Sequence, residues 1–132
     1  MTTSDASTPS ATLERGDAMR RRVLGDAHVE RSRTNATDFT RPLQELVTEY
    51  CWGAIWNRPG LELRDRSLIN LAMLTALGKM DELELHVRGA VRNGLTQEEI
   101  QEVLLQTAIY CGVPSALDAT RHAQAVLNDI NG

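Results

Sequence analysis

The sequence predicts an all-α protein, a compact and oligomeric bundle of about six helices. Apolar residues recur at three- and four-residue spacing along most of the chain, which is the period of one face of an α-helix. Glycine, proline and Thr-x-x-Glu signals divide the chain where these faces stop. No long stretch alternates apolar and polar residues in the way that a half-buried strand does.

Length and charge limit the class of protein. A chain of 132 residues fits one domain, and we expect a disordered tail over 1–12 and a single helical domain over 13–132. The net charge of −4 argues against nucleic-acid binding, and the run Arg20–Arg22 is interpreted as a solvated helix face. No apolar run is long enough to span a membrane and no signal peptide is recognisable, so we expect a cytoplasmic protein.

Three helical segments are expected in the first half of the domain. The first ends at Gly25, because glycine readily takes the left-handed conformation that closes a helix. The second covers 28–35. The third begins near Pro42, because the first turn of a helix leaves unpaired the N–H that proline lacks, and the turn residues at 57–60 end it.

The second half predicts further helices with clear boundaries. Segment 65–77 carries apolar residues on almost every side, which predicts a helix covered by its own domain and by a neighbouring subunit. Asp81 with Glu84 resembles an N-terminal capping pair for the next helix. Residues 96–99, Thr-Gln-Glu-Glu, have the form of a capping box, and the last helix follows the break at 112–114.

Several short segments carry a longer-range pattern: 24–29 (Leu-Gly-Asp-Ala-His-Val), 52–61, 66–68, 85–90 (Leu-His-Val-Arg-Gly-Ala), 93–96 and 110–114. Their order and spacing, from about Arg20 to Leu127, resemble the carboxymuconolactone decarboxylase family. A match in order and spacing over so much of the chain is more specific than any one motif. The resemblance therefore supplies a functional expectation that helical periodicity alone does not.

The wider superfamily includes alkyl hydroperoxidase D proteins, which use a glutamate, a Cys-x-x-Cys pair and a histidine. When the chain is aligned on His86, the glutamate position falls on Ser67 and the two cysteine positions fall on Lys79 and Glu82. A thiol peroxidase needs a low-pKa thiolate and a resolving partner, and this site has neither. The two cysteines, Cys51 and Cys111, have no such spacing and are expected to be small core residues.

The resemblance implies decarboxylation of 4-carboxymuconolactone to the 3-oxoadipate enol-lactone in protocatechuate catabolism, by a homo-oligomer, expected to be a hexamer. This substrate is an unsaturated lactone with two carboxylates, and its ring and carbonyl accept the electrons left by carbon dioxide. No pyridoxal, thiamine or metal cofactor is therefore expected. Two alternatives remain: a thiol-dependent peroxidase or reductase on the same fold, and a non-catalytic helical oligomer that binds a small acid.

The resemblance points to His86 as the proton donor, since imidazole titrates near neutral pH, although a structural histidine is the alternative. Glu82, one helical turn earlier, is expected to orient His86 or to raise its pKa. Arg58 and Arg66 are candidate clamps for the carboxylate that stays on the substrate, because guanidinium binds carboxylate in a bidentate way. Surface ion pairs are the alternative for both arginines.

Two further candidates come from the matching segments. Trp52 and Trp56 lie one helical turn apart and either form a wall for a planar ring or anchor a core. His28 is expected to reach the site of the same or a neighbouring subunit. His122 is expected to be structural or exposed, and Glu45 to be exposed to solvent.

Overall fold

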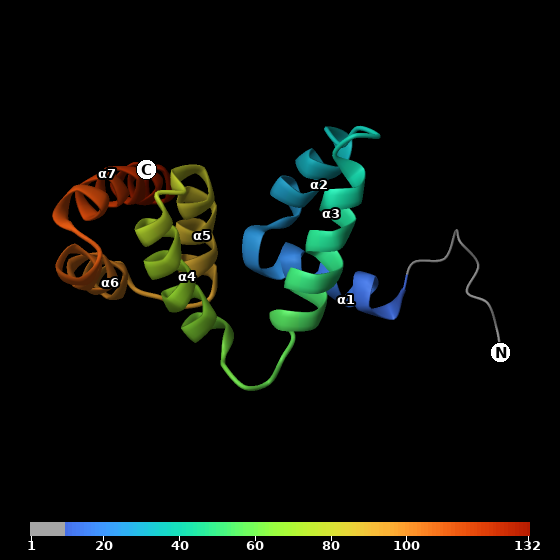
Figure 1. Cartoon of the computed structure of the whole chain (residues 1–132), viewed down its shortest axis with the longest axis horizontal. Coiled ribbons are helices and arrows are strands. Elements are labelled where there is room, and N and C mark those ends of the chain that lie inside the picture. Colours follow the sequence, from blue (N-terminus) through green and yellow to red (C-terminus); the bar gives the residue numbers. More distant parts are fainter. Residues whose placement is uncertain (1–9) are drawn as a thin grey trace. The chain divides into compact units, whose positions relative to one another are not determined.

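The computed structural model describes residues 10–132, and these form seven α-helices and one π-helix without any strand (Figure 1). The predicted all-α class is confirmed. Most of the predicted tail lies outside the described residues, but α1 begins at Ala11, two residues earlier than expected. Ser10 explains this early start, because its side chain accepts a hydrogen bond of 3.0 Å from the N–H of Leu13 and so caps the helix.

The chain divides into two compact units, the first ending at Gly60 and the second covering Leu61–Gly132. This division falls next to the turn that the sequence predicts at 57–60, and the single domain expected over 13–132 stays a prediction. Among the residues described, no helix has both the length and the apolar character needed to cross a membrane.

The first unit contains four consecutive helical elements: α1 (Ala11–Leu24), α2 (Asp26–Thr34), α3 (Arg41–Leu46) and the π-helix η1 (Val47–Ile55). Gly25 separates α1 from α2 with a φ of 92°, at the position the sequence predicts. The helix predicted from Pro42 begins at Arg41 but widens into π-helical turns at Val47. This widening is shown at its end, where the N–H of Trp56 donates to the carbonyl of Cys51, five residues back, at 2.9 Å.

Two glycines allow α1 and η1 to touch through their backbones. A Cβ placed on Gly16 would lie 1.9 Å from the carbonyl oxygen of Thr48, and one on Gly53 would lie 2.4 Å from the carbonyl oxygen of Thr12. No side chain fits into either space without separating the two helices. This glycine contact therefore fixes the position of η1 within the first unit.

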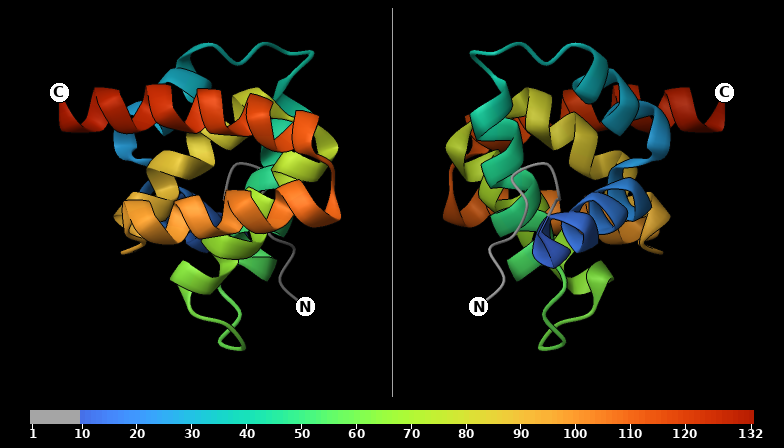
Figure 2. Two further views of the ribbon diagram at one scale, coloured as in Figure 1. Left: turned by 90° about the vertical axis from the view of Figure 1, so that its left-hand side faces the viewer. Right: turned by 90° about the vertical axis from the view of Figure 1, so that its right-hand side faces the viewer.

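The second unit is a bundle of four helices: α4 (Leu63–Leu77), α5 (Met80–Arg92), α6 (Gln97–Tyr110) and α7 (Val113–Asn131). Helix α4 contacts the other three, and α6 and α7 pack side by side, as the left view of Figure 2 shows. The core is aliphatic and is formed by Leu71, Leu83, Val87, Ala90, Leu95, Ile100, Leu104, Ala119, Ala123, Val126 and Leu127.

The cap predictions for this unit have different outcomes. Gly78 ends α4 in the left-handed conformation, and Thr96 with Glu99 forms the complete capping box of α6, so both are confirmed. The predicted pairing of Asp81 with Glu84 is wrong. Helix α5 begins at Met80, which places Asp81 inside the first turn, and Glu84 instead contacts a histidine of α7.

Two burial predictions also differ from the structure. Cys111 is exposed at the end of α6 and Cys51 is only partly buried, so the prediction that both are core residues is wrong for Cys111. On α4, Ile69, Met73 and Leu77 are exposed, so the other helices of the second unit leave this side of the helix uncovered. The expectation that a neighbouring subunit covers it stays a prediction.

Candidate active site

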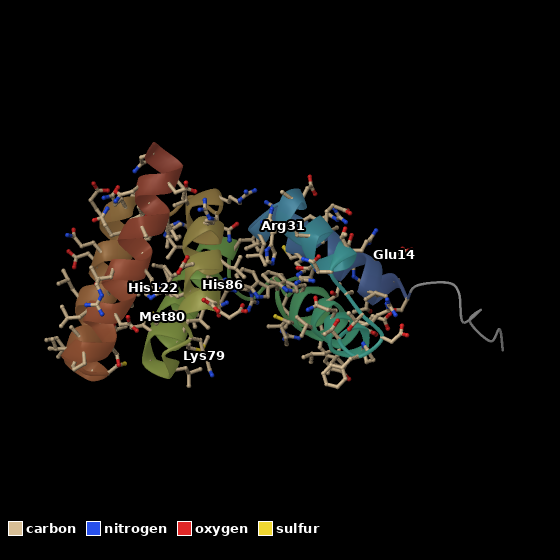
Figure 3. The ribbon with its side chains drawn as sticks, turned by 90° about the horizontal axis from the view of Figure 1, so that it is seen from above. Glu14, Arg31, Lys79, Met80, His86 and His122 are labelled. Carbon is tan, nitrogen blue, oxygen red and sulfur yellow. The ribbon has the colours of Figure 1, made fainter. Side chains whose placement is uncertain are left out.

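His86 lies in the middle of α5, beside the face that this helix buries in the core (Figure 3). Leu83 precedes it by three residues and Ala90 follows it by four, and both are fully buried. The side chain of His86 is itself only 7% exposed. The position predicted from the sequence, next to the buried stripe of α5, is therefore confirmed.

A polar seam joins α4 to α5, and we use this name for the four residues Ser67, Asn70, His86 and Asn93. Nδ2 of Asn70 lies 3.4 Å from Nδ1 of His86. Nδ2 of Asn93 donates a hydrogen bond of 2.9 Å to Oγ of Ser67, which is fully buried. Each contact links one residue of α4 to one from α5 or its C-cap, so the candidate proton donor belongs to a small polar cluster beside the aliphatic core.

Asn70 and Asn93 are not among the candidate residues predicted from the sequence. A signal for both was present. Asn70 interrupts the apolar run of α4 three residues after Ser67, and Asn93 follows His86 by seven residues, two helical turns further along the chain. Which residues of α4 meet which residues of α5 depends on how the helices pack, and the pattern within one helix does not contain that information.

The other two candidates of the second unit differ in exposure. Glu82 is exposed in the first turn of α5, and the contact at Nδ1 of His86 comes from Asn70 on α4. Orientation of His86 by Glu82 stays a prediction. Arg66 is half-buried and precedes Asn70 by four residues, so the two occupy neighbouring positions on one side of α4.

In the first unit, Trp52 and Trp56 stack on one another with their ring centroids 4.8 Å apart and their planes at 26°. Each side chain is only 4% exposed, which supports the role of core anchors over that of a wall for a substrate ring. Arg58 lies in the exposed turn that follows η1, where its N–H donates to the carbonyl of Ile55 at 3.0 Å. The role of Arg58 as a clamp for a carboxylate stays a prediction.

His28 is half-buried on α2 and lines a pocket of about 360 Å³ together with Arg31 and Asn35. Burial lowers the pKa of the His28 imidazole, and the positive charges of Arg20 and Arg31 lower it further. Both effects penalise the imidazolium form. The neutral ring is therefore favoured, and the expected contact of His28 with substrate stays a prediction.

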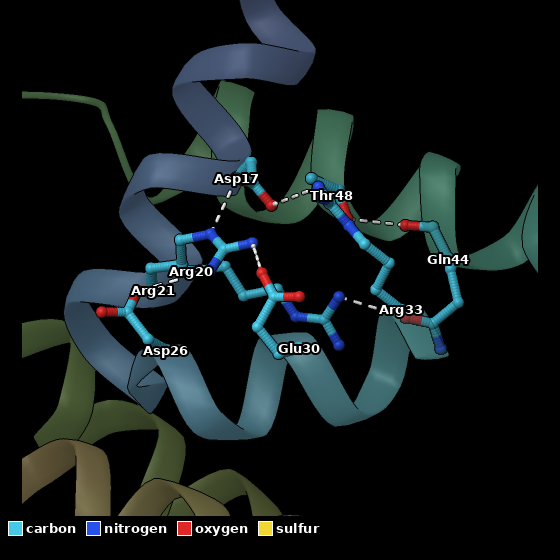
Figure 4. Close-up of polar contacts among 8 residues, drawn as sticks. All are labelled: Asp17, Arg20, Arg21, Asp26, Glu30, Arg33, Gln44 and Thr48. Atoms are coloured by element: carbon cyan, nitrogen blue, oxygen red, sulfur yellow. Dashed lines mark hydrogen bonds and ion pairs between the residues drawn. The ribbon is translucent and has the colours of Figure 1, made fainter. Parts of the chain in front are cut away.

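In the basic run at 20–22, Arg21 forms ion pairs with acidic residues of α1 and α2 (Figure 4). Arg21 donates to Asp17 at 2.9 Å and to Glu30 at 2.5 Å, and a weaker contact of 3.4 Å reaches Asp26. Hydrogen bonds to Asp17 and then Glu30 raise the pKa of the Arg21 guanidinium above its usual value. These ion pairs connect α1 to α2. They give Arg21 a structural role that does not involve nucleic acid.

His122 on α7 has a structural role, as predicted. Its Nδ1 lies 2.6 Å from a carboxylate oxygen of Glu84 on α5, and its Nε2 lies 3.7 Å from a carboxylate oxygen of Asp118. Glu45, as predicted, is exposed. His122 therefore connects two helices of the bundle, while the other histidine of this unit contacts α4.

Comparison with known proteins gives the family. A model of the carboxymuconolactone decarboxylase family matches residues 41–125. The chain belongs to the carboxymuconolactone decarboxylase family. It is 46% identical over 89% of its length to a nitrosuccinic acid decarboxylase of Metarhizium robertsii, covering 82% of that protein. It is 39% identical, again over 89% of its length, to a 4-carboxymuconolactone decarboxylase of Acinetobacter baylyi, covering 87% of that protein.

The chain is also similar to an uncharacterized 15.0 kDa protein of Paracoccus denitrificans. The two are 34% identical over an aligned region that covers 61% of this chain and 61% of that protein. The family match spans α3 through most of α7 and includes the whole polar seam. His86 and its contacts therefore lie within the part of the chain that defines membership of the family.

Proposed function

We propose that this protein is a carboxy-lyase, and that its substrate is 4-carboxymuconolactone, which it converts to the 3-oxoadipate enol-lactone in protocatechuate catabolism. The relationship to two named decarboxylases over 89% of the chain carries this proposal. The buried His86 beside Asn70, within the matched region, supplies a group suited to the proton transfer.

The two relatives' named substrates share a chemical property. In 4-carboxymuconolactone the electrons left by carbon dioxide pass through the ring double bond into the lactone carbonyl. In nitrosuccinic acid the nitro group accepts them when the adjacent carboxylate leaves. Each substrate contains its own electron acceptor, so the protein is required to orient the substrate and to manage charge and protons, without a cofactor that accepts electrons.

The proposed reaction begins with cleavage of the carbon–carbon bond to one carboxylate, which leaves as carbon dioxide. Its electron pair forms a dienolate. Protonated His86 then gives a proton to the carbon beside the lactone carbonyl, so that an N–H bond breaks and a C–H bond forms. A second proton, taken from solvent, then restores the imidazolium form of His86. Positioned proton transfer of this kind contributes about 10² to 10⁴ in rate.

Arginine is the proposed anchor for the carboxylate that remains on the substrate. Arg66 lies on α4 one helical turn before Asn70, and Arg58 lies in an accessible turn of the first unit. A guanidinium binds a carboxylate with two parallel hydrogen bonds, which fixes orientation as well as charge. The proposal assigns substrate binding to these two residues, and proton transfer to His86.

A second candidate substrate is nitrosuccinic acid, because the relative with that activity shares 46% of the aligned residues with this chain. The thiol-peroxidase alternative requires a reactive thiolate near the histidine. The positions that the superfamily uses for cysteines hold Lys79 and Glu82 here, so the side chains of this site favour proton transfer over thiol chemistry.

The test is to incubate the purified protein with each substrate separately and to measure carbon dioxide release and substrate loss. We expect turnover of 4-carboxymuconolactone without added cofactor, and a fall in kcat of about 10²-fold or more in His86→Gln. His122→Gln is the matched control and is expected to stay within threefold of the parent, since His122 contacts carboxylates of α5 and α7.

Four outcomes would contradict parts of this proposal. Turnover of nitrosuccinic acid alone would replace the substrate and keep the reaction class. Full activity of His86→Gln would remove His86 from the mechanism. Hydroperoxide turnover that disappears in Cys51→Ser or Cys111→Ser would establish the thiol alternative, and binding without turnover would establish an acid-binding protein.

Self-association is proposed from the family resemblance together with one surface. Ile69, Met73 and Leu77 form an exposed apolar row on α4 at four-residue spacing, and such rows are commonly covered in oligomers. We propose a homohexamer. Light scattering after size-exclusion chromatography measures the mass, and a monomeric species at micromolar concentration would contradict this assembly.

A further inference from the structure

We infer that Asn70 is a positioning residue for His86: it holds Nδ1 of the imidazole and thereby makes Nε2 the nitrogen that transfers the proton. This inference rests on the proposed function, because it assigns an orientation to the histidine of that reaction. It adds a residue outside the predicted site, and it assigns the two ring nitrogens different tasks.

Two observations support the contact: the distance between the two side chains and the positions of both residues within regular helices. Nδ2 of Asn70 lies 3.4 Å from Nδ1 of His86, and the two residues are sixteen positions apart on different helices. Hydrogen bonds of this length are common in unliganded enzymes and shorten when substrate binds. Asn70 stands in the interior of α4, which ends at Gly78, and His86 stands in the interior of α5, which ends at Asn93, so two regular helices give the contact a fixed frame.

The identity of residue 70 is itself informative. Asn70 stands in the run Leu68-Ile69-Asn70-Leu71-Ala72-Met73-Leu74, where its neighbours are apolar. Asparagine is less favourable than alanine or leucine inside a helix, because its side chain competes for backbone hydrogen bonds. A half-buried amide at this position therefore needs a polar partner, and the structure supplies the imidazole of His86.

A primary amide bonds either form of Nδ1: its NH₂ donates when that nitrogen carries no proton, and its oxygen accepts from Nδ1–H after the amide turns by 180°. In the proposed cycle Nδ1 carries its proton throughout, so the amide oxygen faces it before and after the transfer. The imidazolium gives up the proton on Nε2, the Nδ1–H stays bonded to the amide oxygen of Asn70, and water protonates Nε2 again.

The other contact of the polar seam provides a matched control. Asn93 donates to Ser67 at 2.9 Å and joins the same two helices without involving His86. If Asn70 only joined α4 to α5, removal of either contact would have a similar effect. If Asn70 positions the histidine, its removal alone changes the imidazole and the chemical step.

The experiment compares Asn70→Leu with Ser67→Ala in the full chain. Leucine keeps the approximate size of asparagine and removes both hydrogen-bonding groups. We expect kcat for the decarboxylated substrate to fall roughly tenfold or more in Asn70→Leu, with a smaller change in KM, because the proton donor is no longer aligned. Ser67→Ala is expected to keep kcat within threefold.

The second measurement is independent of activity. Two-bond ¹H–¹⁵N correlation spectra record which nitrogen of each imidazole carries the proton, and His86→Gln assigns the signals among the three histidines. We expect neutral His86 to hold one tautomer in the parent and in Ser67→Ala. In Asn70→Leu its nitrogen shifts are expected to move toward an average of two tautomers.

Unchanged His86 nitrogen shifts in Asn70→Leu would overturn the inference, and so would changed shifts with kcat within twofold of the parent. Failure of the proposed function is a separate result, since full activity of His86→Gln removes the histidine from the reaction whatever Asn70 does. If neither substrate is turned over, the spectra alone decide whether Asn70 fixes the tautomer.

Discussion

Gly16 offers a sharp test of the packing in the first unit, through the substitution Gly16→Ala. The added Cβ would lie 1.9 Å from the carbonyl oxygen of Thr48 and 2.9 Å from the backbone nitrogen of Gly53. Ordinary van der Waals contact begins at 3.4 Å, so α1 and η1 would have to separate by 3.4 − 1.9 = 1.5 Å at this point. The obstructing atoms belong to the backbone, so a side-chain rotation does not relieve the clash.

The expected magnitude combines two opposing effects. Overpacking of a filled space costs about 1–3 kcal/mol, and a clash with backbone belongs at the upper end of that range. Alanine is the better helix former by about 1 kcal/mol, which acts in the opposite direction. We therefore expect Gly16→Ala to lower the free energy of unfolding by about 2 kcal/mol, and to lower Tm by roughly 8 °C or more.

The assay is thermal and urea unfolding followed by circular dichroism, with Gly60→Ala as the control. A Cβ added to Gly60 would meet no atom within 4 Å, and Gly60 has no left-handed φ, so its substitution is expected to change stability by less than about 0.5 kcal/mol. Gly53→Ala should follow Gly16→Ala, since its Cβ would lie 2.4 Å from backbone. A Gly16→Ala protein that melts within about 2 °C of the parent would refute the close contact of these two helices.

Three further predictions concern stability. Leu83→Ala removes a fully buried core side chain and is expected to cost about 2–5 kcal/mol in urea unfolding, so a loss below about 1 kcal/mol would contradict its place in the core. Thr96→Ala removes the capping box of α6 and should cost about 1 kcal/mol, whereas an unchanged urea midpoint would contradict the cap. Burial, then Arg20 and Arg31, lower the pKa of His28 in the folded state, so the unfolded state binds more protons between the two pKa values. The stability that depends on His28 is thus fully present above the pKa of the unfolded state and is lost as pH falls toward the pKa of the folded state. In His28→Gln the free energy of unfolding, measured by urea unfolding at several pH values in this range, should depend less on pH.

Local chemistry explains the helix boundaries that the sequence predicts correctly. Gly25 and Gly78 each have a positive φ at the end of a helix, and Thr96 caps α6 through contacts with a residue three positions away. Such signals act between near neighbours in sequence. They are therefore readable from a single chain without knowledge of packing.

The incorrect predictions depend on contacts between helices. Glu84 has the right spacing to form a cap with Asp81, but His122 on α7 offers it a closer partner at 2.6 Å. Cys111 follows the apolar periodicity of α6, yet it stands in the turn after the last helical residue and is exposed. The π-helical turns from Val47 have no marker in the sequence either, because they accompany the close backbone contact with α1.

The candidate site shows the same division. His86 could be identified because a long pattern of matching segments includes it, and its position beside the buried stripe follows from helical periodicity. Asn70 could not be assigned to it, because the sequence contains no information on which turn of α4 meets which turn of α5. The structure provides this register through two contacts, Asn70 with His86 and Asn93 with Ser67.

Two residues of the polar seam, Ser67 and Asn70, are relevant to the choice between the proposed decarboxylation and thiol chemistry. The position where related peroxidases hold a relay glutamate is Ser67, which is fully buried and accepts a hydrogen bond from Asn93. On α4, the residue that contacts His86 is Asn70, whose side chain is a neutral amide that neither gives up nor takes up a proton. In the proposed reaction, decarboxylation followed by protonation consumes one proton in each turnover, and solvent supplies that proton to His86.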